Sequence, residues 1–245
     1  MICTAPSARV FLFVVFFASI AQFASAADSV KETVVPAPHG VTLKVRMEGP
    51  YTADVPLQVV CYFRYTEAGV KKMKGAPVEL DKHFNGVIGA LRERGEFVGN
   101  PMETLLIAPP AGSIKAKYLL LIGLGDEADL SLDTLEQIGK TALRTATLLG
   151  ISRVAFAPLI RDQGNDKIGA GNVEIAVLRG MLLAYDTQLR LQQQHLAGSY
   201  TLEEWWVEAG PAFYDETVAG VNKAVAEAKK LIASRNSAPY AVKKN

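Results

Sequence analysis

The strongest constraint on the fold is a short apolar run that is followed at once by glycines. Residues Tyr118 to Ile122 read Tyr-Leu-Leu-Leu-Ile, and Gly123-Leu124-Gly125 comes next. Consecutive aliphatic residues without polar alternation are typical of a strand buried on both faces, which requires helices on both sides of its sheet. The run therefore predicts a strand that ends at the glycines and belongs to an α/β domain.

The residues that follow predict a strand–helix–strand unit. Asp133, with Glu136 three residues later, matches the capping pattern of a helix start, and apolar residues then recur at helical spacing to Leu149. After Gly150, residues 153–158 form another short apolar run. We expect the two strands to lie parallel in one sheet with a right-handed crossover, which indicates a three-layer α/β/α sandwich.

Further elements are predicted along the chain from the same periodicities. Residues 66–77 are rich in lysine and glycine and predict a solvated loop. Asp81 and Asn172 are placed to cap two more helices, and residues 213–232 predict a last helix. The remaining strands are expected at 41–47, 57–63, 104–108 and 200–207.

The N-terminal residues predict a secretory signal peptide over 1–26. Arg9 precedes the apolar run Val10 to Ala18, and Ala24-Ser25-Ala26 has the small residues that signal peptidase accepts. We expect cleavage after Ala26 and a secreted or periplasmic protein, with an uncleaved anchor as the alternative. The predicted organisation is then a flexible tail over 27–40, one domain over 41–233 and a polar tail over 234–245.

Charge and cysteine content argue against several classes of partner. The chain has 26 Lys and Arg against 25 Asp and Glu, and removing Arg9 makes the two equal. We therefore expect no nucleic-acid partner and, after cleavage, no membrane partner. Cys61 lies in an apolar run with no neighbour that would lower its pKa, so we expect a buried, inert thiol.

No residue pattern indicates a metal, a cofactor or a catalytic group. The histidines His39, His83 and His195 lack the spacing of metal ligands, and we expect each at the surface. The chain has no Gly-x-Ser-x-Gly elbow for a nucleophile. The sequence therefore predicts no catalytic residue, no metal and no cofactor.

One glycine-bearing loop is placed to contact a ligand. It joins the strand at 153–158 to a helix start, where free backbone N–H groups favour an anion. A mobile surface loop without a ligand is the alternative. The candidate ligand-binding residues are Gly164, Asn165, Asp166, Gly169, Gly171 and Asn172.

Several segments together resemble a known family. They are Leu80-Asp81 with Gly86 and Ile88-Gly89, Tyr118 to Gly125, the alanine-rich helix to Leu149, and Val173 to Tyr185 with Arg179-Gly180. Over residues 41–186 the chain resembles the N-terminal domain of the leucyl aminopeptidase (cytosol aminopeptidase) family. The resemblance implies a macro-domain-like α/β sandwich with a mixed sheet.

The resemblance also sets the functional expectations. In that family a C-terminal domain holds two divalent metals, but its Asn-Thr-Asp-Ala-Glu-Gly-Arg run is absent from this sequence. The resemblance therefore implies a non-catalytic binding, regulatory or assembly module, with a protein partner or a second copy of the chain. One alternative is a nucleotide or ADP-ribose-like binder or hydrolase of the macro-domain type that uses the loop at 164–172. The other is a truncated metalloaminopeptidase.

Overall fold

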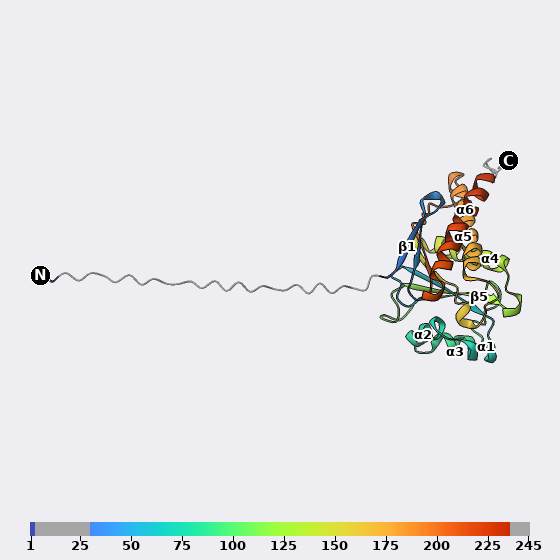
Figure 1. The fold of residues 1–245 in the computed structure, drawn as a ribbon, viewed down its shortest axis with the longest axis horizontal. Coiled ribbons are helices and arrows are strands. Elements are labelled where there is room, and N and C mark those ends of the chain that lie inside the picture. Colours follow the sequence, from blue (N-terminus) through green and yellow to red (C-terminus); the bar gives the residue numbers. More distant parts are fainter. Residues whose placement is uncertain (3–29, 236–245) are drawn as a thin grey trace.

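The computed structural model describes residues 1, 2 and 30–235, and these form a seven-stranded sheet with helices on both faces (Figure 1). Across the sheet the strands follow the order β1-β2-β7-β6-β3-β5-β4. The edge strands β1 and β4 are antiparallel to their neighbours, and the strands between them are parallel. The strands are β1 (Glu32–Pro36), β2 (Thr42–Arg46), β3 (Leu57–Phe63), β4 (Thr104–Ile107), β5 (Tyr118–Gly125), β6 (Arg153–Ala157) and β7 (Glu204–Glu208).

The helices form two layers, one on each face of the sheet. In Figure 1 the long helices lie together on one side and the short helices on the other. The long helices are α4 (Leu132–Leu149), α5 (Ala170–Gln193) and α6 (Tyr214–Ser234), and the short ones are α1 (Glu67–Lys72), α2 (Ala76–His83) and α3 (Val87–Glu93). Each layer packs on its own cluster of buried apolar side chains. The three-layer α/β/α sandwich with a mixed sheet is therefore confirmed.

The apolar run at 118–122 forms a strand that is buried on both faces, as predicted. All of β5 after Tyr118 is buried, and the strand includes Gly123 and ends at Gly125. A Cβ at Gly123 would stand 1.9 Å from the carbonyl oxygen of Asn100, so only glycine lets these two backbones approach so closely. The predicted end of the strand at the glycines is therefore confirmed.

The strand–helix–strand unit is confirmed, with one correction at the start of its helix. Strands β5 and β6 are both parallel to β3, which lies between them. The cap of α4 is Ser131 and not Asp133, because Ser131 has the extended backbone of a cap and its hydroxyl accepts a hydrogen bond from the Thr134 N–H at 3.2 Å. At the other end, Gly150 closes the helix with φ +65°.

The predicted flexible tail at 27–40 is wrong for its second half. Strand β1 pairs with β2 along its whole length, and Val35 is buried against the core. The segment is short and ends at Pro36, so its sequence gives only a weak indication of a strand. The predicted signal peptide at 1–26 and most of the polar tail at 234–245 lie outside the described residues.

Three local predictions on the helices are also corrected. The expected loop at 66–77 contains α1 and the start of α2, which Gly75 at φ +63° and a proline in the first turn allow. Asp81 lies inside α2, and its carboxylate instead accepts from the Gly89 N–H of α3 at 3.1 Å. Asn172 is likewise internal, because α5 already begins at Ala170.

The long helices approach each other closely at glycines. A Cβ at Gly139 would stand 1.9 Å from the carbonyl oxygen of Val177, and one at Gly180 would stand 2.0 Å from that of Glu136. Backbone therefore packs against backbone where α4 and α5 cross. Of the residues described, no helix is long and apolar enough to cross a membrane.

Strand β7 carries both tryptophans of the chain on opposite faces of the sheet. Trp205 is fully buried under the long helices and stacks on Phe156, with ring centroids 5.9 Å apart. Trp206 packs with Ala53, Val55 and Ala155 on the other face. Strand β7 is therefore covered on both sides. The strand ends at Glu208, where the candidate site begins.

Candidate functional site

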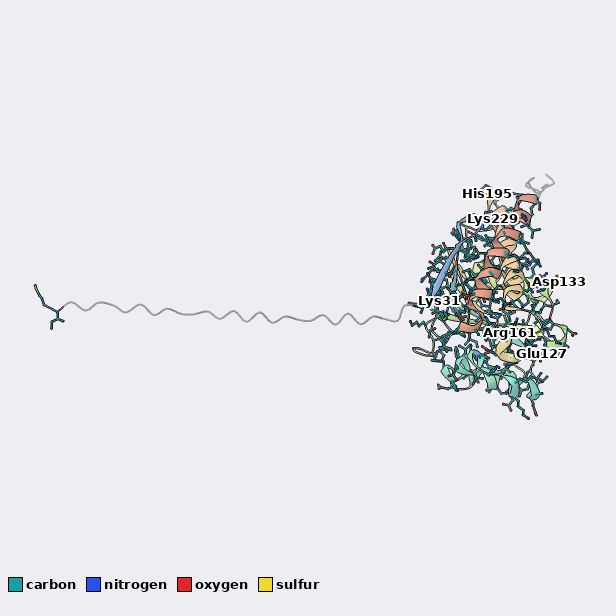
Figure 2. All side chains as sticks on the ribbon, in the orientation of Figure 1. Lys31, Glu127, Asp133, Arg161, His195 and Lys229 are labelled. Carbon is teal, nitrogen blue, oxygen red and sulfur yellow. The ribbon has the colours of Figure 1, made fainter. Side chains whose placement is uncertain are left out.

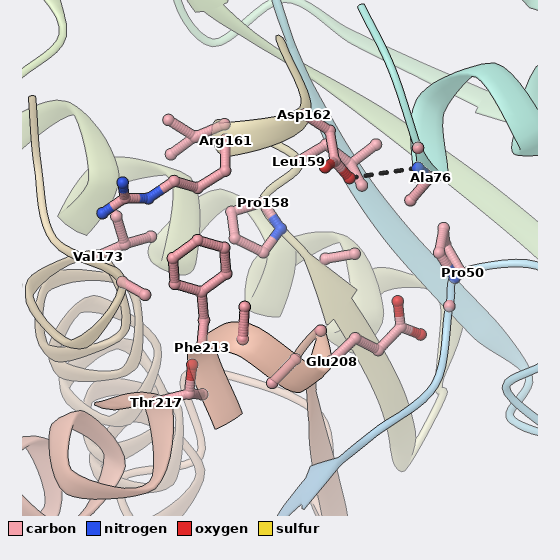
Figure 3. Close-up of a pocket in the computed structure, with 18 of the residues that line it drawn as sticks. Pro50, Ala76, Pro158, Leu159, Arg161, Asp162, Val173, Glu208, Phe213 and Thr217 are labelled. Atoms are coloured by element: carbon pink, nitrogen blue, oxygen red, sulfur yellow. Dashed lines mark hydrogen bonds between the residues drawn. The ribbon is translucent and has the colours of Figure 1, made fainter. Parts of the chain in front are cut away.

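A cavity of about 670 Å³ lies where β2, β6 and β7 end. In open α/β sheets, ligand sites form at the carboxyl ends of parallel strands, where loops diverge. Here the walls come from the segments after these strands and from the first turns of α5 and α6. Figure 3 shows Pro158, Phe213 and Val173 as apolar walls, with Glu208 and Arg161 beside them.

The polar side chains that line this cavity are mostly acidic. They include four carboxyl groups, those of Glu48, Asp162, Glu174 and Glu208, against the one guanidinium of Arg161. Two of the carboxyl groups are already engaged. Glu48 pairs with Arg46, and Asp162 accepts a hydrogen bond from the Ala76 N–H at 3.2 Å (Figure 3).

The other two carboxyl groups are buried with unused oxygens. Both carboxyl oxygens of Glu208 and Oε2 of Glu174 lack a hydrogen-bond partner within the described chain. Burial raises the pKa of Glu174 to about 8. Burial, and then the charge of Glu48, raise the pKa of Glu208 well above its usual range, partly offset by the Gln58 amide and Arg46. Glu174 therefore holds a proton at neutral pH, and the pKa of Glu208 is shifted in the same direction.

Arg161 is the positive group of the cavity and is held by its neighbours. Its Nη2 donates to the carbonyl oxygen of Ile168 at 3.2 Å, and its guanidinium lies 4.9 Å from the ring centroid of Phe213. In Figure 3 the Arg161 side chain runs beside that ring. The stacking fixes the charge at one wall of the cavity, on a segment that precedes the predicted ligand loop.

None of the six predicted ligand residues lines this cavity. The residues before and after them do, Arg161 and Asp162 on one side and Val173 and Glu174 on the other. Two polar groups of the loop are engaged within the protein. Asn165 Oδ1 accepts from the Lys167 N–H at 3.2 Å, and Gly171 N–H donates to Glu216 Oε1 at 3.0 Å. That the six residues bind a ligand stays a prediction.

The three histidines lie at the surface, as expected. His195 is at the end of the helical layer far from Arg161, as Figure 2 shows. Within the described residues, no group of three His, Cys, Asp or Glu side chains is placed to hold a metal ion. Cys61 is buried, as predicted, and burial raises the pKa of its thiol.

Comparison with known proteins identifies the domain. Residues 59–192, more than half of the chain, match the model of the cytosol aminopeptidase family, N-terminal domain. The chain belongs to this family. Probable cytosol aminopeptidases of Persephonella marina and Roseiflexus castenholzii are 25% identical over 139 residues and 31% identical over 114 residues. The matches cover 56% and 46% of this chain, but only 27% and 23% of those relatives, so the chain spans about a quarter of their length.

Solved structures show that this family member shares its fold with two groups of proteins. A mutant of tomato leucine aminopeptidase superposes with a TM-score of 0.55 at 17% identity, covering 83% of this chain and 38% of that one. The Oceanobacillus iheyensis macrodomain with ADP also gives a TM-score of 0.55, at 9% identity, covering 81% and 99%. At these identities the similarity concerns the fold alone. It confirms the macro-domain-like sandwich.

Proposed function

We propose that this member of the family is an exported, non-catalytic binding module that takes a small molecule into the cavity at the ends of β2, β6 and β7. The family match, which covers the N-terminal domain, supports a role other than peptide-bond cleavage. The observation that carries the proposal is Glu208, whose two carboxyl oxygens are buried in the cavity wall without a partner. A buried polar group of this kind is stabilised when a ligand supplies the missing hydrogen bonds.

The chemistry of the walls selects the class of ligand. A basic amine is an ammonium ion at neutral pH, and it can form an ion pair in a site of low dielectric with a buried carboxyl group that releases its proton to solvent on binding. Pro158, Val173 and Phe213 offer apolar surface for the rest of the molecule. We therefore propose an amine with an apolar body as the ligand of this cavity.

A nucleotide or ADP-ribose-like ligand is the second candidate, and the observation that favours it is the shared fold with a macrodomain crystallised with ADP. Two features of this chain weigh against it. The cavity is lined by four carboxyl groups and one guanidinium, which gives a pyrophosphate little charge to pair with. In addition, the carboxylate of Glu216 already accepts from the N-terminus of α5. Anion binding there would have to displace it.

Two further interpretations are kept as proposals with their own tests. Assembly with a protein partner or with a second copy of the chain is tested by light scattering on the purified protein. A longer metalloaminopeptidase that contains this segment is tested by reading the frame that follows the codon for Asn245. Neither bears on whether the cavity takes an amine.

The experiment compares ligands that differ in one group. Thermal unfolding of the purified chain is followed with phenethylamine, with phenethyl alcohol and with ADP-ribose at neutral pH. A ligand at 100 times its Kd adds about 2.7 kcal/mol to the native state, which raises the midpoint visibly. We expect a rise with the amine alone, stronger toward pH 8 because the carboxyl group must lose its proton on binding.

Variants link the result to the cavity. Glu208→Gln keeps the shape of the side chain but cannot form an ion pair, and we expect it to abolish the rise. Glu67→Gln, at an exposed position in the first turn of α1, is the matched control and should leave the rise unchanged. A midpoint raised by ADP-ribose and not by the amine would replace this proposal with the nucleotide alternative.

A further inference from the structure

A second cavity, of about 330 Å³, lies between the end of β3 and the short helices α1, α2 and α3. It shares no lining residue with the cavity at the ends of β2, β6 and β7. Its volume is at the lower end of the range of about 300–1,000 Å³ in which proteins hold small molecules. It therefore has room for one small ligand, and its walls combine apolar and charged side chains.

The inner wall holds a buried arginine that forms no ion pair with the described residues. Arg92 is only 3% exposed, yet no carboxylate of the described chain forms an ion pair with it. Its Nη2 donates to the carbonyl oxygen of Phe63 at 2.8 Å, and its guanidinium lies 4.5 Å from the ring centroid of Tyr62. Its Nε–H has no hydrogen-bond partner in the described part of the chain. A buried guanidinium in this state favours an anionic acceptor beside it.

The hydroxyl of Tyr62 is a second unused donor in the same wall. Tyr62 is 1% exposed, and its hydroxyl has no hydrogen-bond partner among the described residues. Buried tyrosine hydroxyls are normally paired, so this one is unusual in an otherwise apolar setting. Together with Arg92 Nε it offers two donors to one acceptor group. A carboxylate has the two oxygens that such a pair can serve.

An acidic group lines the same cavity. Asp81 uses one carboxylate oxygen, Oδ1, to accept from the Gly89 N–H, and no cation of the described chain pairs with it. Burial lowers the pKa of Arg92, and the charge of Asp81 acts against that shift, although no ion pair joins the two. Lys82 and Glu93, two exposed lining residues, carry opposite charges, so they do not change the net charge of the cavity lining.

Apolar side chains complete the lining between the two charged groups. They come from α1, from the segment after it, from α2 and from α3, so a ligand would contact all of the short helices. A short aliphatic group fits this surface better than a polar one. The apolar lining residues are Val70, Met73, Pro77, Val78 and Ile88.

We propose that this second cavity binds a free α-amino acid with an aliphatic side chain. Its carboxylate accepts from Arg92 Nε–H and the Tyr62 hydroxyl, its ammonium group donates to Asp81, and its side chain lies against Met73 and Ile88. A zwitterion satisfies both charged groups at once, which neither a simple acid nor a simple amine can do. This inference does not depend on the function proposed for the first cavity.

The test measures binding of L-leucine to the purified chain by isothermal titration calorimetry and by thermal unfolding. Isovalerate and isoamylamine are the matched probes, because each lacks one of the two charged groups. We expect saturable binding of one L-leucine per chain, and binding at least about tenfold weaker for each probe, since each leaves one charged hydrogen bond unmade. No saturable heat with L-leucine at millimolar concentration would overturn the proposal.

Variants separate binding from folding. Tyr62→Phe removes only a hydroxyl that has no partner in the unliganded chain, so we expect the variant to be as stable as the unchanged chain and to bind L-leucine at least about tenfold more weakly. Asp81→Asn keeps an acceptor for Gly89 and removes the charge, with the same expectation. Unchanged affinity in both variants would overturn the proposal. So would a loss of L-leucine binding in Glu208→Gln, because it would place the ligand in the first cavity.

Discussion

Glu216 and Gly171 join two helices through one hydrogen bond, in which the Gly171 N–H at the start of α5 donates to Glu216 Oε1 of α6 at 3.0 Å. The start of a helix carries partial positive charge and unpaired N–H groups. In this chain a carboxylate from the neighbouring helix satisfies one of them. The Glu216 side chain therefore acts as a cap supplied from outside the helix, at the place where the sequence predicts a ligand.

Removing this cap should weaken the fold modestly. We expect Glu216→Ala to lower the free energy of unfolding by about 1 kcal/mol, the usual loss on removing a capping side chain from a solvent-accessible helix start. Urea unfolding followed by circular dichroism measures the change. Asp215→Ala is the control, because its ion pair with Lys31 is exposed. Equal losses in the two variants would show that the hydrogen bond to Gly171 contributes nothing of its own.

The buried carboxyl groups should make stability fall as the pH rises. The pKa of Glu174 is about 8 in the folded chain against a usual 4.5, so between these values the folded state keeps a proton that the unfolded state has released. The free energy of unfolding then falls with pH by up to about 1.4 kcal/mol per unit. We expect Glu174→Gln to flatten this slope in unfolding curves measured from pH 5 to pH 8.

The matched control for that slope is Glu67→Gln, which changes an exposed carboxyl group and should leave the slope as it is. Glu208 has a raised pKa as well, so part of the slope should survive in the Glu174 variant. A Glu174→Gln chain whose stability varies with pH just as the unchanged chain does would show that Glu174 is ionised in the folded state at neutral pH.

The crossing of α4 and α5 should not tolerate a methyl group. In Gly180→Ala the new Cβ would stand 2.0 Å from the Glu136 carbonyl oxygen, so the helices must move apart. We expect the free energy of unfolding to fall by about 2–3 kcal/mol, as for overpacked cores. Gly198→Ala is the control, since nothing lies within 4 Å of its Cβ position. Similar midpoints of thermal unfolding for both variants would contradict the close backbone contact.

Export makes a prediction that rests on residues 1–26 alone. We expect the protein recovered from the medium or the periplasm to begin at Ala27, because Ala24-Ser25-Ala26 matches the preference of signal peptidase. Intact-mass spectrometry measures the start of the chain. Ala26→Leu should block processing, whereas Ala27→Leu, one residue beyond the expected cut, should not. A chain recovered only in the cytoplasm with all its N-terminal residues would refute export.

The sequence predicts most of the sheet because its strands are short apolar runs of distinct character. The run at 118–122 and the strands at 57–63 and 153–158 are buried on both faces, so their composition alone marks them. Strand β1 was not predicted, because it has only five residues and its mixture of polar and apolar side chains resembles that of a loop. Helix α1 was not predicted either, because its glycine and lysines give the helix no apolar face.

The candidate site was harder to predict because it depends on segments that are distant along the chain. Glu208 is the last residue of the strand that carries both tryptophans. An acidic residue directly after the apolar run Trp-Trp-Val is a sequence signal that could have indicated a buried carboxyl group. Glu174 carries no such signal, since it is a single carboxyl group within the helix α5. Its burial follows only from the packing of the helix start against the sheet. The capping of α5 by Glu216 is a contact across 45 residues.

The two tryptophans give this chain a built-in optical probe. Since the sequence holds no other indole, all of its tryptophan emission originates from one strand, with one ring on each side of the sheet. Trp205 is fully buried, and Trp206 lies beneath the cationic side chains of Lys44 and Arg46. A change in polarity above either face should shift a different part of the spectrum. Fluorescence of the unlabelled protein can therefore tell which face of strand β7 responds first when the chain is perturbed.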